Sequence, residues 1–524
     1  MASAAKKQVV LLMTDTTRYD MLGCVTPGIA TPNLDNLASR GIRFNRAYTC
    51  QPVCGPARSA IFTGLYPHTN GCWGNNLPLY ANAATIGKRL ADQGIPAGYI
   101  GKWHLDGTDY FGNGFCPEGF LPDYWYDMRT YLMELSPADR YRSRRMAAMY
   151  EDGGIPAEFT YGRRCSDRAI RFLKEFAGRD FFLTVSYDEP HGPSLCPEPY
   201  ASMYRNYDFP KAPNVWDTLE GKPAYQRYWA GKAAESDRDA LKIRPAALLG
   251  CNSFVDDEIG RVLAAIREQA PDALIIFTSD HGDALQSHCL SGKACSVYDE
   301  MARVPLIVTG GSGSPEGQVL SGVVSDRPVS HINLVPTILE YLGLPVPRRL
   351  EGRSLLPACH DIKTDVNGCV FMEFGRYEVI HDQMGGLQLM RGVFDGRYKM
   401  AVNLMDTDEL YDLETDPWEM VNLIHSTVPE HRQMALHLHD RILQWMNDTR
   451  DPFRGYQWGI RHWRPDYMPP KGLWMLEGMS RQMENEEYEP RQLEYWTGLP
   501  ITGPVEVPNQ PLSAEELETR LKAL

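Results

Sequence analysis

No stretch of this 524-residue sequence stays apolar over the roughly 20 residues that a membrane-spanning helix requires. The N-terminal segment has only five consecutive apolar residues, Val9 to Met13, which are too few for the core of a secretory signal. We therefore expect a protein that makes no membrane contact and is cytoplasmic, or secreted or periplasmic if a signal sequence was removed.

An excess of positive charge is also missing. The net charge is −14 and the pI is near 5.5, which disfavours nucleic acid and anionic membranes as partners. An anionic substrate must therefore be bound by a local cluster of positive side chains that works against the overall field.

The twelve cysteines lack the spacing of a small disulfide scaffold. Cys50 and Cys54 are followed by no Cys or His pair at zinc-finger distance, which argues against a zinc site. In a cytosolic protein most of these thiols should be reduced and buried. Taken alone, Cys54 would be read as a packed thiol.

What the sequence does contain is a repeated helix-to-strand alternation. An apolar run at 8–15 is followed by helix-like spacing at 31–44, with Gly41 expected as the helix cap. The same alternation recurs at 85–105, 167–191 and 256–283. It predicts an α/β fold in which a large, mainly parallel sheet lies between layers of helices.

The pattern changes after about residue 360. Residues 386–417 alternate like antiparallel strands with turn signals, and 429–448 read as one amphipathic helix. We therefore predict a catalytic α/β domain at 1–365 and a smaller α+β subdomain at 366–450. The aromatic and proline-rich extension at 451–524 should cover its own core or contact a second subunit, which would make the protein a homo-oligomer.

Polar residues follow the predicted strands where a parallel sheet binds ligands. Two of them, Asp15 and Asp280, could each simply cap a helix. Together they would repel each other at one sheet edge unless a divalent cation lay between them, and His281 would add a nitrogen that manganese accepts readily. The strand-end residues are Asp15, Lys102, His104, His191, Asp280 and His281.

Six segments of the sequence resemble the type I sulfatases of the alkaline phosphatase superfamily, and they occur in the same order as in that family. The most specific is "CGPARSAIFTGLYPHTNG", which is similar to the Cys-x-Pro-x-Arg signature of that family. The resemblance covers roughly residues 8 to 425 and implies an alkaline-phosphatase-like fold. The other segments are "GKWHL" (101–105), "EPHGP" (189–193), "TSDHGD" (278–283), "GKACSVYDEMARVPLIV" (292–308) and "ELYDLETDPWEMVNL" (409–423).

The resemblance implies that Cys54 is oxidised by a maturation enzyme to formylglycine. One hydroxyl of its hydrate would attack sulfur, and the second would then expel sulfate, which a serine cannot do. Arg58 would hold the diol, Lys102 and Lys293 would pair with sulfate oxygens, and His104 and His191 would be base and proton donor. The implied metal, Ca²⁺ with Mn²⁺ or Mg²⁺ as alternatives, would be bound by Asp15, Thr16, Cys54, Asp280 and His281.

One position departs from the family pattern. Most sulfatases carry a second acidic residue after the first metal aspartate, and this chain has Thr16 there. The related phosphonate monoester hydrolases, which also use formylglycine, have a neutral amide at that place. They differ from this chain at "GKWHL", so Lys102 and His104 favour sulfate esters.

Two loops near the predicted site indicate the kind of substrate. Loops at 71–79 and 109–128 mix aromatic, amide and acidic side chains, which suits a sugar face and equally an aryl sulfate. Sulfated carbohydrate is preferred, with small aryl sulfates as the alternative. The candidate substrate contacts are Trp73, Asn75, Asn76, Asp106 and Trp125.

Three hypotheses follow. The first is a metal-dependent sulfatase with formylglycine at position 54. The second is a phosphonate monoester or phosphodiester hydrolase of the same superfamily. The third is a non-catalytic sulfoglycan-binding protein in which Cys54 stays a thiol. His288, Cys289 and Cys295 are expected to be structural.

Overall fold

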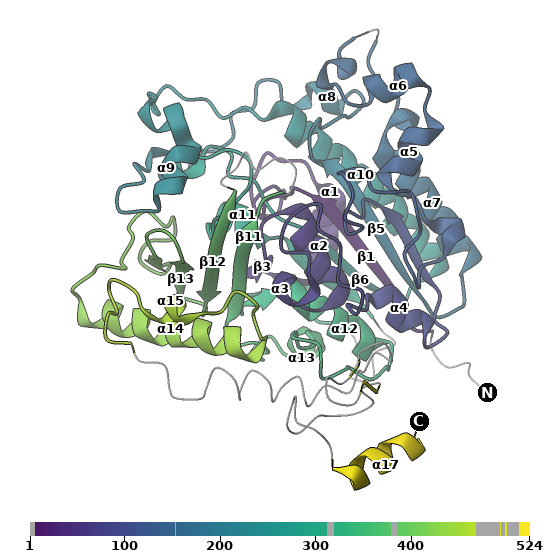
Figure 1. Cartoon of the computed structure of the whole chain (residues 1–524). Helices are drawn as coiled ribbons and strands as arrows, with labels where there is room; N and C mark the ends of the chain where they lie inside the picture. Colours follow the sequence, from purple (N-terminus) through teal and green to yellow (C-terminus); the bar gives the residue numbers. More distant parts are fainter. Residues whose placement is uncertain are drawn as a thin grey trace.

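The computed structural model describes residues 6–467 apart from 152, 312–318 and 379–385, together with 493, 498–499 and 513–523. A large, mostly parallel sheet is covered by helices, and a smaller antiparallel sheet stands beside it (Figure 1). The predicted fold class is confirmed. Among the helices of the described residues, none is long and apolar enough to cross a membrane.

The large sheet has seven strands in the order β4-β5-β1-β6-β8-β2-β9. The interior strand β1 pairs in parallel with both neighbours, and every residue of β1 is buried, as expected for a strand covered on both faces. β8 runs antiparallel to β6 and to β2. The strands are β1 (Gln8–Asp15), β2 (Gly41–Phe44), β4 (Ala97–Gly101), β5 (Phe181–Pro190), β6 (Leu274–Ser279), β8 (Leu306–Gly310) and β9 (Val323–Ser325).

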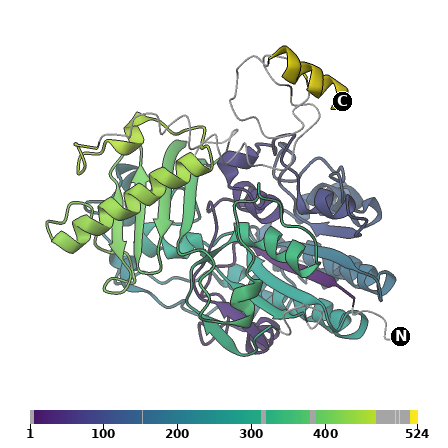
Figure 2. The same cartoon turned by 90° about the horizontal axis from the view of Figure 1, so that it is seen from below.

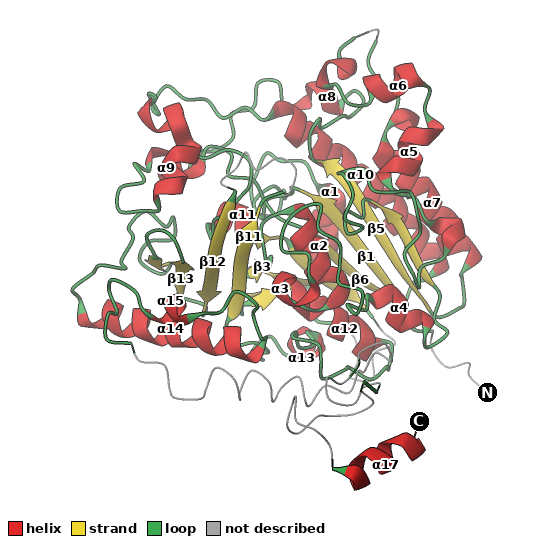
Figure 3. Cartoon of the chain, in the orientation of Figure 1, coloured by secondary structure: helices red, strands yellow, loops and turns green. Residues whose placement is uncertain are grey.

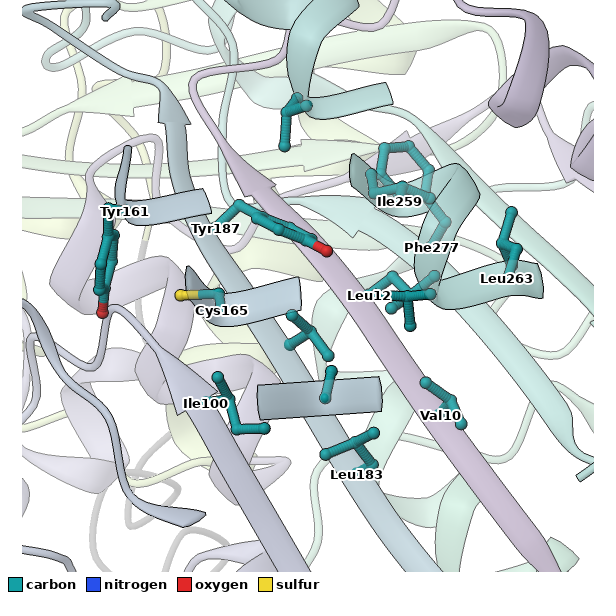
Figure 4. Packing of buried hydrophobic residues seen from close by; sticks show 14 of the residues in the cluster. Val10, Leu12, Ile100, Tyr161, Cys165, Leu183, Tyr187, Ile259, Leu263 and Phe277 are labelled. Atoms are coloured by element: carbon teal, nitrogen blue, oxygen red, sulfur yellow. The ribbon is translucent and has the colours of Figure 1, made fainter. Parts of the chain in front are cut away.

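Helices cover the sheet on two sides (Figure 3). Val10 and Leu12 of β1 face a core built with α1 (Pro32–Ser39), α7 (Tyr161–Glu175) and α10 (Ala246–Gln269), seen closely in Figure 4. The alternate residues of β1 face the opposite core. That core is built with α2 (Cys54–Thr63), α4 (Ile86–Ala91), α12 (Leu334–Tyr341) and α13 (Leu356–His360).

Gly41 is not a helix cap. Helix α1 ends at Ser39, and Gly41 is the first residue of β2. A Cβ atom on Gly41 would lie 2.3 Å from the backbone oxygen of Val308 on β8. The glycine is therefore required by the close approach of two strands, a need that only the folded sheet reveals.

The remaining elements of the α/β domain are short. A three-stranded sheet joins β10 (Val329–Ser330), β3 (Ala47–Tyr48) and β7 (Arg303–Val304). The short helices are α3 (Pro67–Asn70), α5 (Met128–Glu134), α6 (Pro137–Arg142), α8 (Tyr200–Met203), α9 (Ala224–Ala230) and α11 (Asp299–Ala302). The 3₁₀ turns are η1 (Pro122–Tyr124), η2 (Met146–Met149), η3 (Ala157–Phe159), η4 (Pro213–Trp216), η5 (Gly231–Glu235), η6 (Ser287–Cys289) and η7 (His331–Asn333).

The C-terminal part forms the predicted antiparallel sheet with a long helix packed on it (Figure 2). Residues 451–467 pack against this subdomain, where Asp451 forms a buried ion pair with Arg391. Most of the 451–524 extension lies outside the described residues, so its role in oligomerisation stays a prediction. The elements are β11 (Val370–Arg376), β12 (Leu387–Phe394), β13 (Tyr398–Asn403), β14 (Glu409–Asp412), α14 (Pro429–Asp448), α15 (Tyr456–Gly459) and α17 (Ala514–Ala523).

A buried lysine–carboxylate cluster joins the two parts of the chain. Lys399 of β13 donates to the Val297 carbonyl at 2.9 Å, to Asp299 at 2.5 Å and to Glu419 at 2.8 Å. These three acceptors match the three donors of an ammonium group. The lysine–carboxylate cluster consists of Asp217, Lys222, His288, Asp299, Lys399 and Glu419.

Candidate active site

Neighbouring strands of the large sheet deliver charged side chains to one place. Asp15 ends β1, Asp280 follows β6, Lys102 follows β4, and Asp188 lies near the end of β5. Lys102 Nζ lies 2.8 Å from Asp15 and 3.0 Å from Asp188, and all three are buried. The structure therefore brings these strand ends together at the edge where parallel sheets bind ligands.

Cys54 is the first residue of α2, and its sulfur is where the charged groups converge. Sγ lies 2.9 Å from Lys293 Nζ, 3.3 Å from His281 Nε2 and 3.8 Å from Asp15 Oδ1. Lys102 Nζ is 3.9 Å away. Two buried lysines thus point their ammonium groups at one side-chain atom.

The charged groups around Cys54 shift the pKa of its thiol. Burial and Asp15 raise the pKa of Cys54, but Lys102, Lys293 and His281 outweigh them and hold this pKa well below its ordinary value. The position therefore favours a negatively charged or electron-rich group over a neutral thiol.

Arg58 lies one helical turn after Cys54 and is fully buried. It donates from Nε to Asp280 at 3.0 Å and from Nη2 to Asp15 at 3.0 Å, and Nη1 donates to the Lys102 carbonyl and to Ser186 Oγ. Four of its five N–H donors are thus used by the protein. Arg58 holds the two carboxylates and the end of β4 in place, and its predicted contact with a diol stays a prediction.

A candidate metal centre lies beside Cys54. One ligand atom from each of four buried residues comes within 4.8 Å of the others. Burial and the neighbouring Asp15 raise the pKa of Asp280, because two buried carboxylates share the site. The oxygen and imidazole donors therefore fit a divalent cation. The four residues are Asp15, Cys54, Asp280 and His281.

Thr16 takes the place of the family's second acidic residue. Its backbone is left-handed, with φ 71°, and its hydroxyl donates to Asp15 Oδ1 at 2.8 Å. Its amide donates to Asp280 Oδ1 at 3.2 Å. Thr16 thus orients both aspartates.

Tyr110 organises the side of the site next to β5. Its ring lies 4.0 Å from Lys102 Nζ, and its hydroxyl is 3.0 Å from His191 Nδ1 and contacts Asp188. Burial, Lys102 and Lys293 lower the pKa of His191 to about 4. The imidazole is therefore neutral near pH 7 while no anion is bound.

Two neighbouring asparagines hold the residues around the site. The side chain of Asn75 accepts a hydrogen bond from the Gly55 amide at 2.8 Å, directly after Cys54. Asn76 lies 3.1 Å from His104 Nε2. Both predicted substrate contacts are therefore bonded to the protein.

The other three predicted substrate contacts lie differently. Trp125 is only 9% exposed and packs in the core against Tyr99 and Trp103, so it is an interior residue. The Asp106 carboxylate accepts hydrogen bonds from the backbone amides of Thr108 and Asn113 and so stabilises the loop to which it belongs. Trp73 packs edge-on against Phe453 of the C-terminal part.

Sequence reasoning missed three residues of the site. Asp188 stands in "VSYDEPH" at a strand end, so the strand-end rule could have found it. Ser186 and Glu378 carry no such signal. Ser186 is a small buried partner of Arg58, and Glu378 comes from the segment that follows β11, more than 300 residues after Asn76 in the sequence.

Charged strand ends that converge on a cysteine at the start of a helix are the arrangement expected from the resemblance to hydrolases of the alkaline phosphatase superfamily. A sequence profile of the sulfatase family matches residues 7–344. A second profile, described as the C-terminal region of N-sulphoglucosamine sulphohydrolase, matches residues 292–448. The chain belongs to the sulfatase family, whose members are sulfuric ester hydrolases.

Individual proteins agree with this assignment. The chain is 40% identical to the uncharacterized sulfatase YidJ of Escherichia coli strain K12, over 94% of this chain and 97% of that protein. It is 30% identical to the multifunctional alkaline phosphatase superfamily protein PehA of Trinickia caryophylli, over 84% and 95%. A phosphonate monoester hydrolase structure from Agrobacterium radiobacter superposes with a TM-score of 0.69 at 25% identity, over 84% and 96%.

Proposed function

We propose that this sulfatase hydrolyses sulfate monoesters through formylglycine at position 54, assisted by a divalent metal. One observation carries the proposal. Lys102 and Lys293 are buried and converge on the side chain of residue 54, beside a group of metal-binding type. A tetrahedral anion that reacts at residue 54 would meet both ammonium groups at once.

The aldehyde hydrate at position 54 would supply two hydroxyl groups on one carbon, one to accept the sulfuryl group and one to release it. The residues around it have matching tasks. Lys102 and Lys293 bind sulfate oxygens, and His104 accepts a proton during release. Tyr110 and Asp188 orient His191, which in its protonated form donates a hydrogen bond to the oxygen of the leaving alcohol.

Asp15, Asp280 and His281 would hold the metal together with residue 54. Such a cation lowers the pKa of a bound hydroxyl and offsets charge that develops on sulfate oxygens. Ca²⁺ is our first candidate, and the nitrogen of His281 makes Mn²⁺ the main alternative. Metal analysis of the purified protein distinguishes these ions.

For the substrate we propose a sulfated carbohydrate, with aryl sulfates as accessory substrates. The support is the match to the C-terminal profile of a sulphohydrolase that is named for a sulfated sugar. Tyr110, part of the aromatic loop at 109–128, also lies at the site. An aromatic ring next to hydrogen-bonding side chains suits a sugar face.

Mass spectrometry of the tryptic peptide 47–58 tests the central step. This peptide contains both Cys50 and Cys54, so Cys50 is an internal control for alkylation. We expect one alkylated cysteine and, at position 54, the mass of an aldehyde in place of the thiol. Two alkylated cysteines in fully active protein would refute the mechanism and favour a binding protein with an unmodified thiol.

A second candidate function is the hydrolysis of phosphonate monoesters or phosphodiesters. The 30% identity to PehA, described as multifunctional, favours it, as does the neutral Thr16. Turnover of an aryl sulfate and of an aryl phosphonate monoester should be compared on one preparation. We expect the higher kcat/KM for the sulfate, and a strong phosphonate preference would reverse this ranking.

A further inference from the structure

The amide of Asn76 lies between the imidazole of His104 and the carboxylate of Glu378. His104 Nε2 is 3.1 Å from Asn76 Oδ1, and Asn76 Nδ2 donates to Glu378 Oε1 at 2.7 Å. The three residues come from the loop after α3, the end of β4 and the segment that follows β11. The Asn76 side chain thus links Glu378, from the C-terminal part of the chain, to His104, a candidate catalytic residue.

Hydrogen-bond chemistry fixes the direction of this chain of contacts. An ionised carboxylate only accepts hydrogen bonds, so the NH₂ group of Asn76 must face Glu378. The carbonyl oxygen of Asn76 must then face His104, and it too only accepts. His104 Nε2 therefore carries a proton, and the lone pair of the neutral ring is on Nδ1.

Two further observations agree with this arrangement. Nδ1 of His104 is buried and has no hydrogen-bond partner within the described part of the chain. His104 and Asn76 both have left-handed backbones, with φ values of 60° and 63°. Such conformations cost energy in non-glycine residues and persist where the surroundings impose them, often at functional sites.

His104 also lies next to the reacting residue. Its carbonyl oxygen is 3.3 Å from the position that a Cβ on Gly55 would take, and Gly55 follows Cys54 directly. Asn75, the neighbour of Asn76, accepts the Gly55 amide hydrogen bond. The loop that carries Asn76 therefore contacts both His104 and the start of α2.

We infer that Asn76 and Glu378 are positioning residues that hold His104 in the Nε2–H tautomer, so that Nδ1 acts as the base. This inference rests on the proposed function for the role of His104, but the tautomer itself does not. In the release step, the O–H bond of the free hydroxyl on residue 54 breaks and its proton moves to Nδ1. The electron pair of that bond forms the C=O bond of the aldehyde, and the C–O bond to the sulfate group breaks, so that sulfate leaves with its electron pair. His104 becomes an imidazolium whose Nε2–H still donates to Asn76.

The tautomer is measured directly by NMR of the full-length protein labelled with ¹⁵N-histidine. Two-bond ¹⁵N–¹H couplings show which nitrogen carries the proton, and the His104 signals are those that His104→Gln removes. We expect the Nε2–H form in the wild type at a pH where the ring is neutral. Observation of the Nδ1–H form would overturn the inference.

Variants test the cause of the tautomer. Asn76→Gly removes the amide without straining a left-handed backbone. We expect a mixture of tautomers and a kcat for an aryl sulfate that is about 10- to 100-fold lower, with KM changed less, as for other groups that orient a reacting residue. An unchanged wild-type tautomer in Asn76→Gly would refute the role of Asn76.

A charge exchange separates positioning from general damage to the fold. Asn76→Asp alone places two carboxylates against each other and should lower kcat and the population of the Nε2–H form. In the double variant Asn76→Asp/Glu378→Gln, the introduced amide donates to the introduced carboxylate, which again accepts from Nε2–H of His104. We expect recovery to within about fivefold of the wild-type kcat, a coupling that merely additive structural damage would not produce.

The matched control is Glu340→Gln on α12, the same exchange at another half-buried glutamate, which should leave both readouts unchanged. Failure of the double variant to restore the tautomer would refute the relay. If the wild type carries no aldehyde and turns over no sulfate ester, the proposed function fails, while the NMR measurement still decides the tautomer.

Discussion

Two buried clusters in this chain use the same kinds of side chain for different ends. The site around Cys54 and the lysine–carboxylate cluster each contain two buried lysines, several carboxylates and a histidine. The site around Cys54 contains a group of metal-binding type, and the second cluster contributes His288 and Glu419 to another such group, which Glu300 completes. Residue types alone therefore do not separate a reactive site from a structural one.

The two clusters differ in the hydrogen-bond partners of their lysine ammonium groups. The ammonium group of Lys399 donates hydrogen bonds to three oxygen atoms. The ammonium group of Lys222 forms hydrogen bonds with Asp217, His288 and the Glu419 carbonyl. At the active site Lys293 instead faces Cys54 Sγ and a ring nitrogen, both at 2.9 Å. A lysine whose donors are all matched by protein acceptors stabilises the fold, whereas one aimed at an exchangeable group is available for chemistry.

The largest effect is expected for Cys54→Ser. Serine offers one hydroxyl, so the variant should accept a sulfuryl group at most once and then stop, and intact mass should show the added group. Cys50→Ser, a buried cysteine four residues earlier, is the control that should keep its turnover. Sustained multiple turnover by Cys54→Ser would contradict the need for two oxygens.

Metal content should separate the two groups of metal-binding type. We expect about one divalent ion per chain, lost in Asp280→Asn and retained in His288→Gln, because Lys222 and Lys399 already neutralise the second group. Strong chelation should abolish sulfate ester hydrolysis. Full activity in metal-free protein, or loss of the ion in His288→Gln alone, would contradict this assignment.

Lysine-to-methionine exchanges should affect activity at the site around Cys54 and stability at the lysine–carboxylate cluster. Lys293→Met should lower kcat/KM by about 10²- to 10³-fold, as expected when a charge that stabilises the transition state is lost. Lys399→Met leaves buried carboxylates unpaired and should cost about 3–5 kcal/mol of stability. Activity of the folded fraction and the apparent Tm check both. A larger loss of Tm in Lys293→Met than in Lys399→Met would reverse the comparison.

The sequence predicted the site where local pattern and strand ends coincide. Asp15, Lys102 and Asp280 follow apolar runs, and because parallel strands end at one sheet edge, their convergence could be anticipated. The C-terminal helix at 429–448 was predicted with its observed bounds, since its apolar periodicity is local.

What the sequence could not give depends on contacts between distant segments. Arg58 sits one turn after Cys54, but only the fold shows that Asp15 and Asp280 occupy its donors. Trp125 looks like a substrate contact in an aromatic loop, yet it fills a core beside Tyr99. Such outcomes are decided by tertiary packing, which leaves no periodic signal in the chain.

The smallest effect concerns acid stability. His288 is buried, faces Asp217, Lys222 and Glu300, and stacks on Tyr298. Burial and Lys222 lower its pKa, so below its ordinary value of about 6.5 the folded state binds fewer protons than the unfolded state. Stability should therefore fall as the pH drops through that range.

His288→Gln removes this titration while keeping a polar side chain. The apparent Tm of the variant should fall less than that of the wild type between about pH 7.5 and 5.5, by an amount equivalent to roughly 1 kcal/mol. Thermal unfolding at a series of pH values measures the two slopes. A steeper dependence of the Tm on acid pH in the variant would mean that His288 is protonated in the folded protein. The hydrogen bonds described for the lysine–carboxylate cluster would then be wrong at His288.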